Sequence, residues 1–412
     1  MPAKFYRLVA VLFFLGVSGM AQDKKDTIAI VLSDNDIKLS ALPYYNYGRG
    51  VGLTAPDSLF QFNIRFRMQN RASVEFDEGE ETGISAQIRR LRLRFDGFVG
   101  DPKFVYAIQL SFAPGDVGVI QEGQNVNIIR DAVVFYRPNA HWNIGFGQTK
   151  LPGNRQRVNS SGALQLTDRT INNANFNIDR DFGLQTYYIH SKPNSFGYEL
   201  KTAISTGEGR NWTKTSDNKL AYTGRLEVFP FGSFTKGGAY FEGDLMRETT
   251  PKLMLSGTYH FNHGALRTQG QQGSELFEAR DLTAVFLDAI LKYNGWSFQT
   301  AYMSRNTPDA ITINPLNTSE RRLVLAGYGF DGQLSYLLPK DIELIGRYSK
   351  SYPKSQIREF LPETEQYTLG VTKYIWEHAF KIQAEVTNTR QDFFLGDAKR
   401  NWYVRFQVEI GI

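Results

Sequence analysis

Apolar and polar residues alternate along most of the chain after residue 58. In the clearest run, residues 60–69, every even position is Phe, Ile or Met and every odd position is Gln, Asn or Arg. Successive side chains of a β-strand point to opposite faces of the sheet, so a period of two predicts strands with one apolar and one polar face. The same period recurs in residues 90–96, 104–112, 142–146, 198–204, 222–228, 253–261, 296–302, 342–348, 367–371, 380–386 and 402–410. The chain is therefore predicted to be all-β.

The connections between these segments alternate between short turns and long polar loops. The short set is residues 100–102, 137–140, 190–195, 293–295, 338–340 and 375–377. The long set is residues 114–125, 150–179, 206–218, 262–279, 306–320, 351–363 and 388–399. Short turns at one rim and long loops at the other are typical of a transmembrane antiparallel up-and-down β-barrel. Counting on this basis predicts about 16 strands, if residues 230–251 form one connection at the short-turn rim rather than an additional strand pair.

The first 21 residues have the pattern of a secretory signal peptide. Lys4 and Arg7 precede an apolar stretch at residues 8–17, and Ala21 precedes a polar segment. The apolar stretch is about half of the roughly 20 residues that a membrane-spanning helix needs. This length favours a signal peptide over a membrane anchor, so the protein is predicted to leave the cytoplasm.

The exported part of the chain divides into two segments. Residues 22–57 lack clean alternation and are interpreted as an N-terminal periplasmic extension, whereas residues 58–412 are the predicted barrel domain. Aromatic residues make up 14% of the chain, with 30 Phe and 21 Tyr, and aromatic girdles mark both membrane interfaces of an outer-membrane barrel. A large soluble β-sandwich reaches similar totals. The alternation of turns and loops favours the barrel, placed in the lipid of a Gram-negative outer membrane.

The composition excludes several classes of function. The chain has no cysteine, which removes thiolate metal sites, cysteine nucleophiles and lipid attachment at an N-terminal cysteine. Its five histidines are not accompanied by a nucleophile and an orienting group in any catalytic pattern, so no enzyme, metal site or cofactor is predicted. Of the 47 basic residues, Lys4 and Arg7 lie in the signal peptide, and the other 45 exceed the 42 acidic residues by only 3. A net charge of this size does not predict nucleic-acid binding.

Any anion preference must then come from where the charges point. Arg90, Arg92 and Arg94 recur at every second position, which places them on one strand face with Cα atoms about 6.5–7 Å apart. Together with Arg65 and Arg67 on the preceding strand, they predict a basic strip along a pore wall. Guanidinium groups stay charged and match phosphate oxygens with paired donors, so such a strip can pass an anion between weak sites.

The same arginines have a second interpretation. Asp96, Asp131 and Glu227 can pair with inward-facing cations, and the interior would then be a salt-bridged wall without net selectivity. Both interpretations predict that these side chains face the lumen. They differ in whether some of the cationic charge stays unpaired and can attract a solute anion.

The longest connection, residues 150–179, carries a cluster of cations. These are Lys150, Arg155, Arg157 and Arg169, with Arg180 just beyond the loop. A loop of this length in a compact domain is usually functional or disordered. Its mixture of apolar and amide side chains predicts that it packs against other parts of the protein. We expect it to fold into the lumen and form the constriction of the pore; the alternative is an exposed outer loop.

Several motifs resemble the phosphate-selective porin O and P family. They are GFGQTKLP at residues 145–152, SS at 160–161, DR at 168–169, RDFG at 180–183, RLRLRF at 90–95, DA at 131–132, and Arg225 followed by FPFG at 229–232. This resemblance, spread over residues 58–412, implies a sixteen-stranded trimeric barrel, a third loop folded into the pore, an arginine ladder, lysines near the constriction and phosphate or polyphosphate as solute. It assigns solute contact to Lys150, Arg169, Arg180 and the arginines of residues 90–94. The chain departs from many outer-membrane barrels by ending on Ile412 rather than on an aromatic residue.

The sequence thus predicts an outer-membrane porin for the passive diffusion of small anions, with phosphate or polyphosphate as the leading solutes and a homotrimer as the assembly that the resemblance implies. Two alternatives remain open. One is a weakly selective general or saccharide porin, in which lumen-facing Tyr, Asn and Gln would matter more than Arg. The other is a receptor or adhesion barrel with a closed lumen and no conductance.

Overall fold

The structure is a computed structural model that describes residues 50–55, 59–78, 80–117, 127–211 and 218–412. The predicted signal peptide, residues 1–21, and the greater part of the predicted extension, residues 22–57, lie outside these described residues. No helix in the described part of the chain is both long and apolar enough to cross a membrane.

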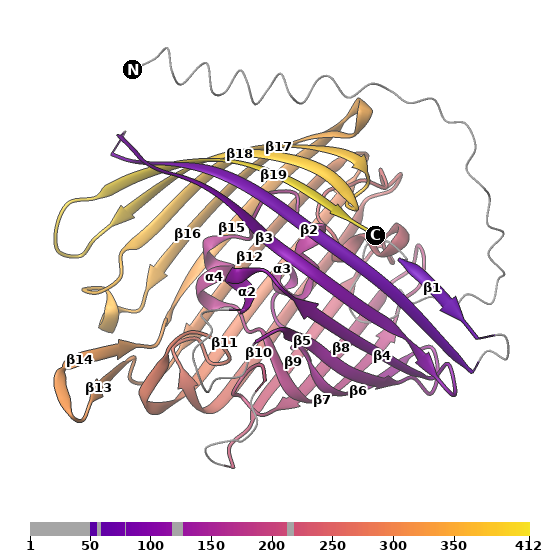
Figure 1. The fold of residues 1–412 in the computed structure, drawn as a ribbon, viewed down its shortest axis with the longest axis horizontal. Helices are drawn as coiled ribbons and strands as arrows, with labels where there is room; N and C mark the ends of the chain where they lie inside the picture. The colour runs from indigo at the N-terminus through magenta and orange to yellow at the C-terminus, as the bar shows by residue number, and fades with distance from the viewer. Residues whose placement is uncertain (1–49, 56–58, 79, 118–126, 212–217) are drawn as a thin grey trace.

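The described residues form a closed antiparallel barrel of sixteen strands, as the sequence predicted (Figure 1). The strands are β2 (Phe60–Asp77), β3 (Glu80–Val99), β4 (Phe104–Ser111), β5 (Ile129–Tyr136), β6 (Trp142–Lys150), β7 (Arg180–His190), β8 (Gly197–Ser205), β9 (Ala221–Phe229), β10 (Lys252–Arg267), β11 (Glu275–Tyr293), β12 (Trp296–Asn306), β15 (Gly327–Leu338), β16 (Ile342–Pro353), β17 (Glu363–Trp376), β18 (Phe380–Asp392) and β19 (Lys399–Gly411). Each strand pairs with its neighbours in the chain, apart from the hairpin inserted between β12 and β15.

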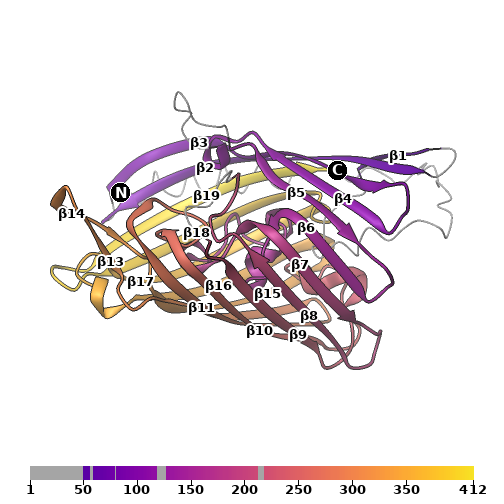
Figure 2. The same ribbon diagram turned by 90° about the horizontal axis from the view of Figure 1, so that it is seen from below.

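The barrel closes where the last strand meets the first. β19 pairs with β2 in a register that runs from Asn401 opposite Asp77 to Gly411 opposite Arg67. β19 does not reach the first residues of β2. There the short strand β1 (Val51–Thr54) pairs with residues 61–64 of β2, so the predicted extension adds one strand segment to this edge. Figure 2 shows β2, β3 and β19 on one side of the barrel and β8 to β11 on the other.

The alternation seen in the sequence separates the two faces of the wall. Outward side chains are exposed, such as Leu369 at 68% and Phe146 at 62%, whereas inward side chains such as Gln69 and Arg225 are at most 1% exposed. Aromatic pairs also lie on neighbouring strands of the outer face, including Trp296 and Tyr336 with ring centroids 4.6 Å apart. Apolar groups can face lipid only if the polar positions turn inward, so the lumen receives the charged residues.

Two connections differ from the prediction. The loop predicted at residues 262–279 is confined to residues 268–274, because β10 and β11 continue as a paired ladder beyond the apolar band. Residues 306–320 include most of a hairpin of β13 (Ile311–Asn314) and β14 (Asn317–Leu323). Residues 230–251 form a single connection that contains the 3-10 helix η3 (Thr235–Tyr240), so the predicted absence of an extra strand pair is confirmed.

The remaining helices of the residues that the structure describes are short. They are α2 (Pro114–Val117), α3 (Arg155–Val158), η2 (Ser161–Ala163), α4 (Ile171–Phe176), η4 (Pro339–Asp341) and η5 (Ser355–Ile357). Three of them, α3, η2 and α4, belong to the connection between β6 and β7. This connection, residues 151–179, is called the inner loop below.

Candidate functional site

The inner loop touches inward-facing side chains on strands far from β6 and β7. Thr167 donates from its backbone N and its Oγ1 to the carboxylate of Glu385 on β18, at 2.9 and 2.7 Å. Thr170 Oγ1 donates to Asp331 Oδ2 on β15 at 2.8 Å. Thr170 is also the N-cap residue of α4, because its Oγ1 accepts a hydrogen bond from the backbone N of Asn173. A loop that reaches both of these strands from the end of β6 crosses the interior of the barrel.

A second segment enters the lumen from the short-turn rim. In the connection 230–251, Phe241 is fully buried, and the backbone N of Glu242 donates to the carbonyl of Ala163 in the inner loop at 2.9 Å. Lys292 Nζ on β11 donates to the carbonyls of Gly238 and Phe241 at 2.7 and 2.9 Å. The inner loop and this connection therefore brace each other, and together they fill one side of the lumen.

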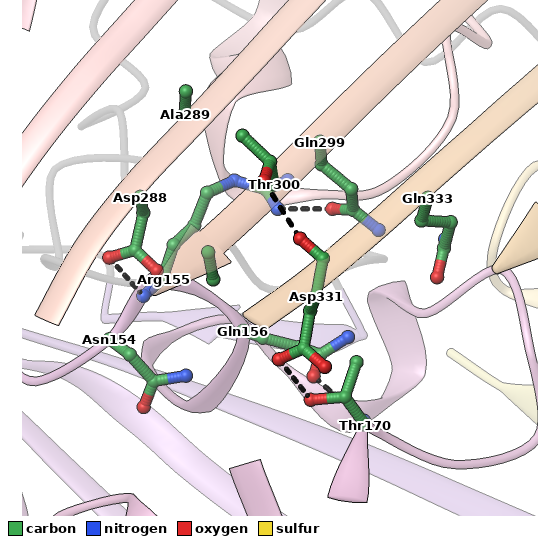
Figure 3. A pocket seen from close by; sticks show the side chains of 11 residues that line it. Asn154, Arg155, Gln156, Thr170, Asp288, Ala289, Gln299, Thr300, Asp331 and Gln333 are labelled. Carbon is green, nitrogen blue, oxygen red and sulfur yellow. Dashed lines mark hydrogen bonds between the residues drawn. The ribbon is translucent and has the colours of Figure 1, made fainter. Parts of the chain in front are cut away.

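Arg155 anchors the inner loop to that filled side (Figure 3). Its Nη1 donates to Gln299 Oε1 at 2.5 Å, its backbone N to Asp288 Oδ2 at 3.0 Å and its Nε to the carbonyl of Ala239 at 2.9 Å. The cavity beside it, of about 30 Å³, has room for little more than a water molecule. Arg155, predicted to line the pore, is therefore placed on the wall-facing side of the loop.

The opposite side of the inner loop bounds a cavity of about 180 Å³, called the arginine cavity here. Six of the ten predicted residues line it: Arg90, Arg92, Lys150, Arg157, Arg169 and Arg180. The side chains of Arg155 and Arg157 enter different cavities because side chains two positions apart on a helix point about 200° from each other. α3 thus directs one arginine to the wall and the other to the cavity.

Three further arginines line the arginine cavity and were not predicted. Arg89 comes from β3, Arg130 from β5 and Arg210 from the loop between β8 and β9. Arg89 and Arg130 each fall at a break in the strand register, where a bulge leaves the residue without an opposite partner. A bulge changes the face to which a side chain points, so alternation alone does not find these residues.

Cationic charge dominates the arginine cavity. Among the described residues that line it, nine are Lys or Arg and two, Asp116 and Asp179, are carboxylates. Asp179 pairs with Arg157 at 2.5 Å and with Arg180 at 3.4 Å. Two carboxylates outside the lining also pair with its cations, Asp131 with Arg180 and Asp168 with Arg89 and Arg90. The salt bridges of the second interpretation are therefore present, but nine cations still exceed these four carboxylates around the cavity.

Two cations of the cavity are held by backbone carbonyls of the inner loop. Lys150 Nζ donates to the carbonyls of Val158 and Asn159 at 2.8 and 2.9 Å. Arg169 Nε donates to the carbonyl of Gln156 at 2.6 Å, and its Nη2 to that of Asn159 at 3.0 Å. Each of these bonds satisfies a donor without adding a compensating negative charge. The loop therefore fixes these groups in position while their charge still acts on the cavity.

A smaller cavity of about 60 Å³ lies toward the short-turn rim and is called the inner cavity. It is lined by the other three predicted arginines, Arg65, Arg67 and Arg94, together with Arg92, which also lines the arginine cavity. The register places Arg65 opposite Arg94 and Arg67 opposite Arg92, so the five predicted strand arginines do form one strip. Asp96 accepts from Arg65 at 2.9 Å and from Arg94 at 3.1 Å, so the strip is partly neutralised at this end.

The two cavities meet where the strip touches the inner loop. Arg67 Nη2 and Arg92 Nη1 donate to Ser161 Oγ at 2.7 and 3.1 Å. Gly162 lies so close that a Cβ there would come within 2.4 Å of Arg67 Nη1. This contact is the junction between the arginine cavity and the inner cavity. Two carboxylates also border it: Asp116 accepts from Arg92 Nη2 at 2.7 Å, and Glu409 Oε1 lies 3.7 Å from Arg67 Nε.

The search for a metal centre covers the described residues only. In the part of the chain that the structure places, no three His, Cys, Asp or Glu side chains are arranged to hold a metal ion. His260 is buried against Thr223 and Gln271, at 2.8 and 3.2 Å, and does not line either cavity.

Comparison with known proteins places the chain among porins. The family described as phosphate-selective porin O and P matches residues 62–392. The fold is similar to the outer membrane channel DcaP of Acinetobacter baumannii, with a TM-score of 0.53 and 12% identity over 88% of this chain and 100% of that chain. It is also similar to OmpF of Salmonella typhi, solved with daunomycin, with a TM-score of 0.51 and 14% identity over 87% of this chain and 100% of that one. A search of curated proteins finds no match.

Proposed function

The chain belongs to the phosphate-selective porin O and P family, and from this premise we propose that it is an outer-membrane porin through which small anions, phosphate or polyphosphate first among them, diffuse passively. The observation that carries the proposal is the excess of nine cations around the arginine cavity over the four carboxylates that pair with them, Asp116, Asp131, Asp168 and Asp179. A potential of this sign concentrates anions and excludes cations from the narrow part of a channel.

The chemistry of the lining groups favours oxyanions. A guanidinium presents paired donors at the spacing of two phosphate oxygens, and the cavity is lined mostly by arginines. Arg92 borders both cavities, so an anion bound there can move from one to the other without losing its hydrogen bonds. Conduction requires that each site hold the anion only weakly, and the carbonyls and carboxylates that share these donors lower the affinity of each site.

The assembly belongs to the same proposal. The family resemblance implies a homotrimer embedded in outer-membrane lipid, with each protomer containing its own pore. No cofactor or metal has a part in passive diffusion. The solutes and the protomers of the trimer are then the partners of the protein.

Phosphate should block the chloride current of the purified protein in a planar bilayer. We expect Arg169→Gln to raise the half-blocking phosphate concentration about tenfold, because it removes a charged donor worth about 1.5 kcal/mol or more. Arg390→Gln is the matched control, since Arg390 pairs with Asp392 at the outer rim and lines neither cavity. A chloride current that phosphate leaves unchanged would favour a general or saccharide porin, and no current at all would favour a closed receptor barrel.

A further inference from the structure

A histidine and a lysine meet under the inner loop, next to the inner cavity. His378 lies in the short turn between β17 and β18, Lys381 follows at the start of β18, and both side chains are at most 1% exposed. Lys381 Nζ donates to the carbonyls of Gly162 and Leu164 at 2.8 and 2.6 Å and to His378 Nδ1 at 3.0 Å. An ammonium group has three hydrogens, so these acceptors use every donor of Lys381.

The other contact of His378 decides which ring nitrogen carries the hydrogen. Nε2 lies 3.0 Å from the backbone carbonyl of Glu242, which can only accept, so Nε2 donates and Nδ1 accepts from Lys381. Burial and the charge of Lys381 lower the pKa of the His378 imidazole well below its ordinary value, so the ring is neutral. His378 therefore links the connection 230–251 to Lys381 and, through Lys381, to the inner loop.

Three successive carbonyls of the inner loop are held by this arrangement. Lys381 binds those of Gly162 and Leu164, and the backbone N of Glu242 donates to the carbonyl of Ala163 at 2.9 Å. Gly162 and Ala163 belong to η2, and Leu164 follows it. The position of η2 is thus fixed by Lys381 and by the residue whose own carbonyl accepts from the histidine.

The position of η2 matters because it carries the hydroxyl at the junction of the two cavities. Ser161 Oγ accepts from Arg67 Nη2 and Arg92 Nη1, the arginines that border the inner cavity there. A Cβ at Gly162 would come within 2.4 Å of Arg67 Nη1 and 2.8 Å of Glu409 Oε1, so η2 is packed directly onto the lining groups. A shift of η2 would change the spacing between the hydroxyl and the two guanidiniums.

A second buried lysine shows that such contacts need not involve the junction. Lys292 Nζ also donates to two backbone carbonyls, those of Gly238 and Phe241, but both belong to the connection 230–251. Neither Lys292 nor its two acceptors line the arginine cavity or the inner cavity. By contrast, Gly162, which Lys381 binds, lines the inner cavity.

We propose that His378 is a positioning residue for the anion path. Through Lys381 it sets where η2 holds Ser161, and so determines whether an anion at the junction can bind Arg67 and Arg92 at the same time. The arginines supply the charge that favours anions, whereas His378 affects only their geometry. Charge selectivity and phosphate affinity should therefore respond differently to its loss. This inference rests on the proposed function and names a residue that supports the same site.

His378→Phe tests the inference in the same bilayer experiment, with inorganic phosphate as the probe. The variant keeps a ring that can pack against Phe241 and Tyr374, whose centroids lie 5.8 and 5.1 Å from that of His378, but loses both polar contacts. We expect the half-blocking phosphate concentration to rise about threefold to tenfold, the factor that one displaced hydrogen bond is worth. The ratio of chloride to potassium permeability should stay at its wild-type value, because no cation is removed.

His378→Asn is the conservative variant. The amide oxygen of asparagine takes the place of Nδ1 and keeps an acceptor for Lys381, so the half-blocking concentration should stay near the wild-type value. A value for His378→Asn as high as that for His378→Phe would contradict a role exerted through Lys381. A permeability ratio that falls together with phosphate affinity would also contradict the inference, because the loss would then not be confined to geometry.

His260→Phe is the matched control for the loss of a buried imidazole. His260 is 2% exposed, its ring nitrogens lie 2.8 Å from Thr223 Oγ1 and 3.2 Å from Gln271 Nε2, and it lines neither cavity. We expect its half-blocking concentration to equal that of the wild type. Equal rises in the two phenylalanine variants would show a general loss of stability and would overturn the inference.

A second pair of variants serves if His378→Phe does not assemble. Lys381→Met should raise the half-blocking concentration, whereas Lys292→Met, which also removes a buried lysine from two carbonyls, should not. Equal values for the two methionine variants would overturn the inference as well.

The chloride current without phosphate separates this inference from the proposed function. A displaced η2 should make the open-channel current of His378→Phe fluctuate more than that of His260→Phe. If phosphate does not block the wild type but this difference is present, the proposed function fails and the positioning role stands. If the wild type is blocked and the two variants agree in both measurements, the inference alone fails. Absence of block and absence of the difference would contradict both.

Discussion

Replacing Arg90, Arg92 and Arg94 together by glutamine is expected to lower the ratio of chloride to potassium permeability by at least about tenfold. Arg90 and Arg92 line the arginine cavity, and Arg92 and Arg94 line the inner cavity, so the change removes charge from both. It also leaves Asp116 and Asp96 with fewer cationic partners. Two charges about 4 Å apart interact by a few kcal/mol near a protein surface, and about 1.4 kcal/mol is already a factor of ten.

The permeability ratio follows from the zero-current potential across a bilayer under a KCl gradient. The matched control replaces the same three arginines by lysine, which keeps the charge but loses the paired donors. We expect the lysine variant to keep its preference for chloride over potassium and to bind phosphate more weakly. An unchanged permeability ratio in the glutamine variant would show that the strip does not set selectivity.

Replacing Arg225 by methionine is expected to destabilise the barrel and to loosen the inner loop. Arg225 is almost completely buried; its Nε lies 2.5 Å from Glu227, and its Nη1 lies 2.9 Å from Asp288 and 2.8 Å from the carbonyl of Gly153. Removing one partner from a buried ion pair costs about 3–5 kcal/mol, because a buried carboxylate loses its compensation. The loop loses its attachment at Gly153 at the same time, so the single-channel current should also become larger and noisier.

Urea unfolding of the protein in lipid vesicles measures the first effect. Arg390→Met is the control, because that arginine and its partner Asp392 are both more than 40% exposed and such pairs contribute about 0–1 kcal/mol. Unfolding midpoints that coincide for the two variants would contradict the role assigned to the Arg225 network. A lowered midpoint with an unchanged current would separate the stability of the barrel from the position of the loop.

The strands of the barrel were predictable because lipid and lumen impose opposite polarities on neighbouring residues. Residues 60–69 alternate without a break, and β2 includes all of them. The ends of strands were harder to predict where the strands extend past the apolar, lipid-facing band of the barrel. In β10 and β11 the hydrogen-bonded ladder continues to Arg267 opposite Glu275, although the register shifts on either side of Ala265 and the period of two is lost.

The candidate site was predictable to the extent that it is built on regular strands. Arg65, Arg67, Arg90, Arg92 and Arg94 lie side by side as the alternation and the hairpin order required. Arg89 and Arg130 were missed because each lies at a bulge, and Arg210 because a loop offers no periodic signal. The sequence also did not indicate that residues 230–251 would enter the lumen, since the burial of Phe241 depends on contacts with the inner loop and β11.

The zero-current potential of the wild-type protein under a KCl gradient tests the central claim most directly. The excess of cations around the arginine cavity predicts a potential close to the equilibrium potential of chloride. A potential near zero would contradict an anion-selective pore and would favour a salt-bridged wall without net selectivity. A potential of the opposite sign would mean that the carboxylates of the lumen, not its arginines, determine which ions pass.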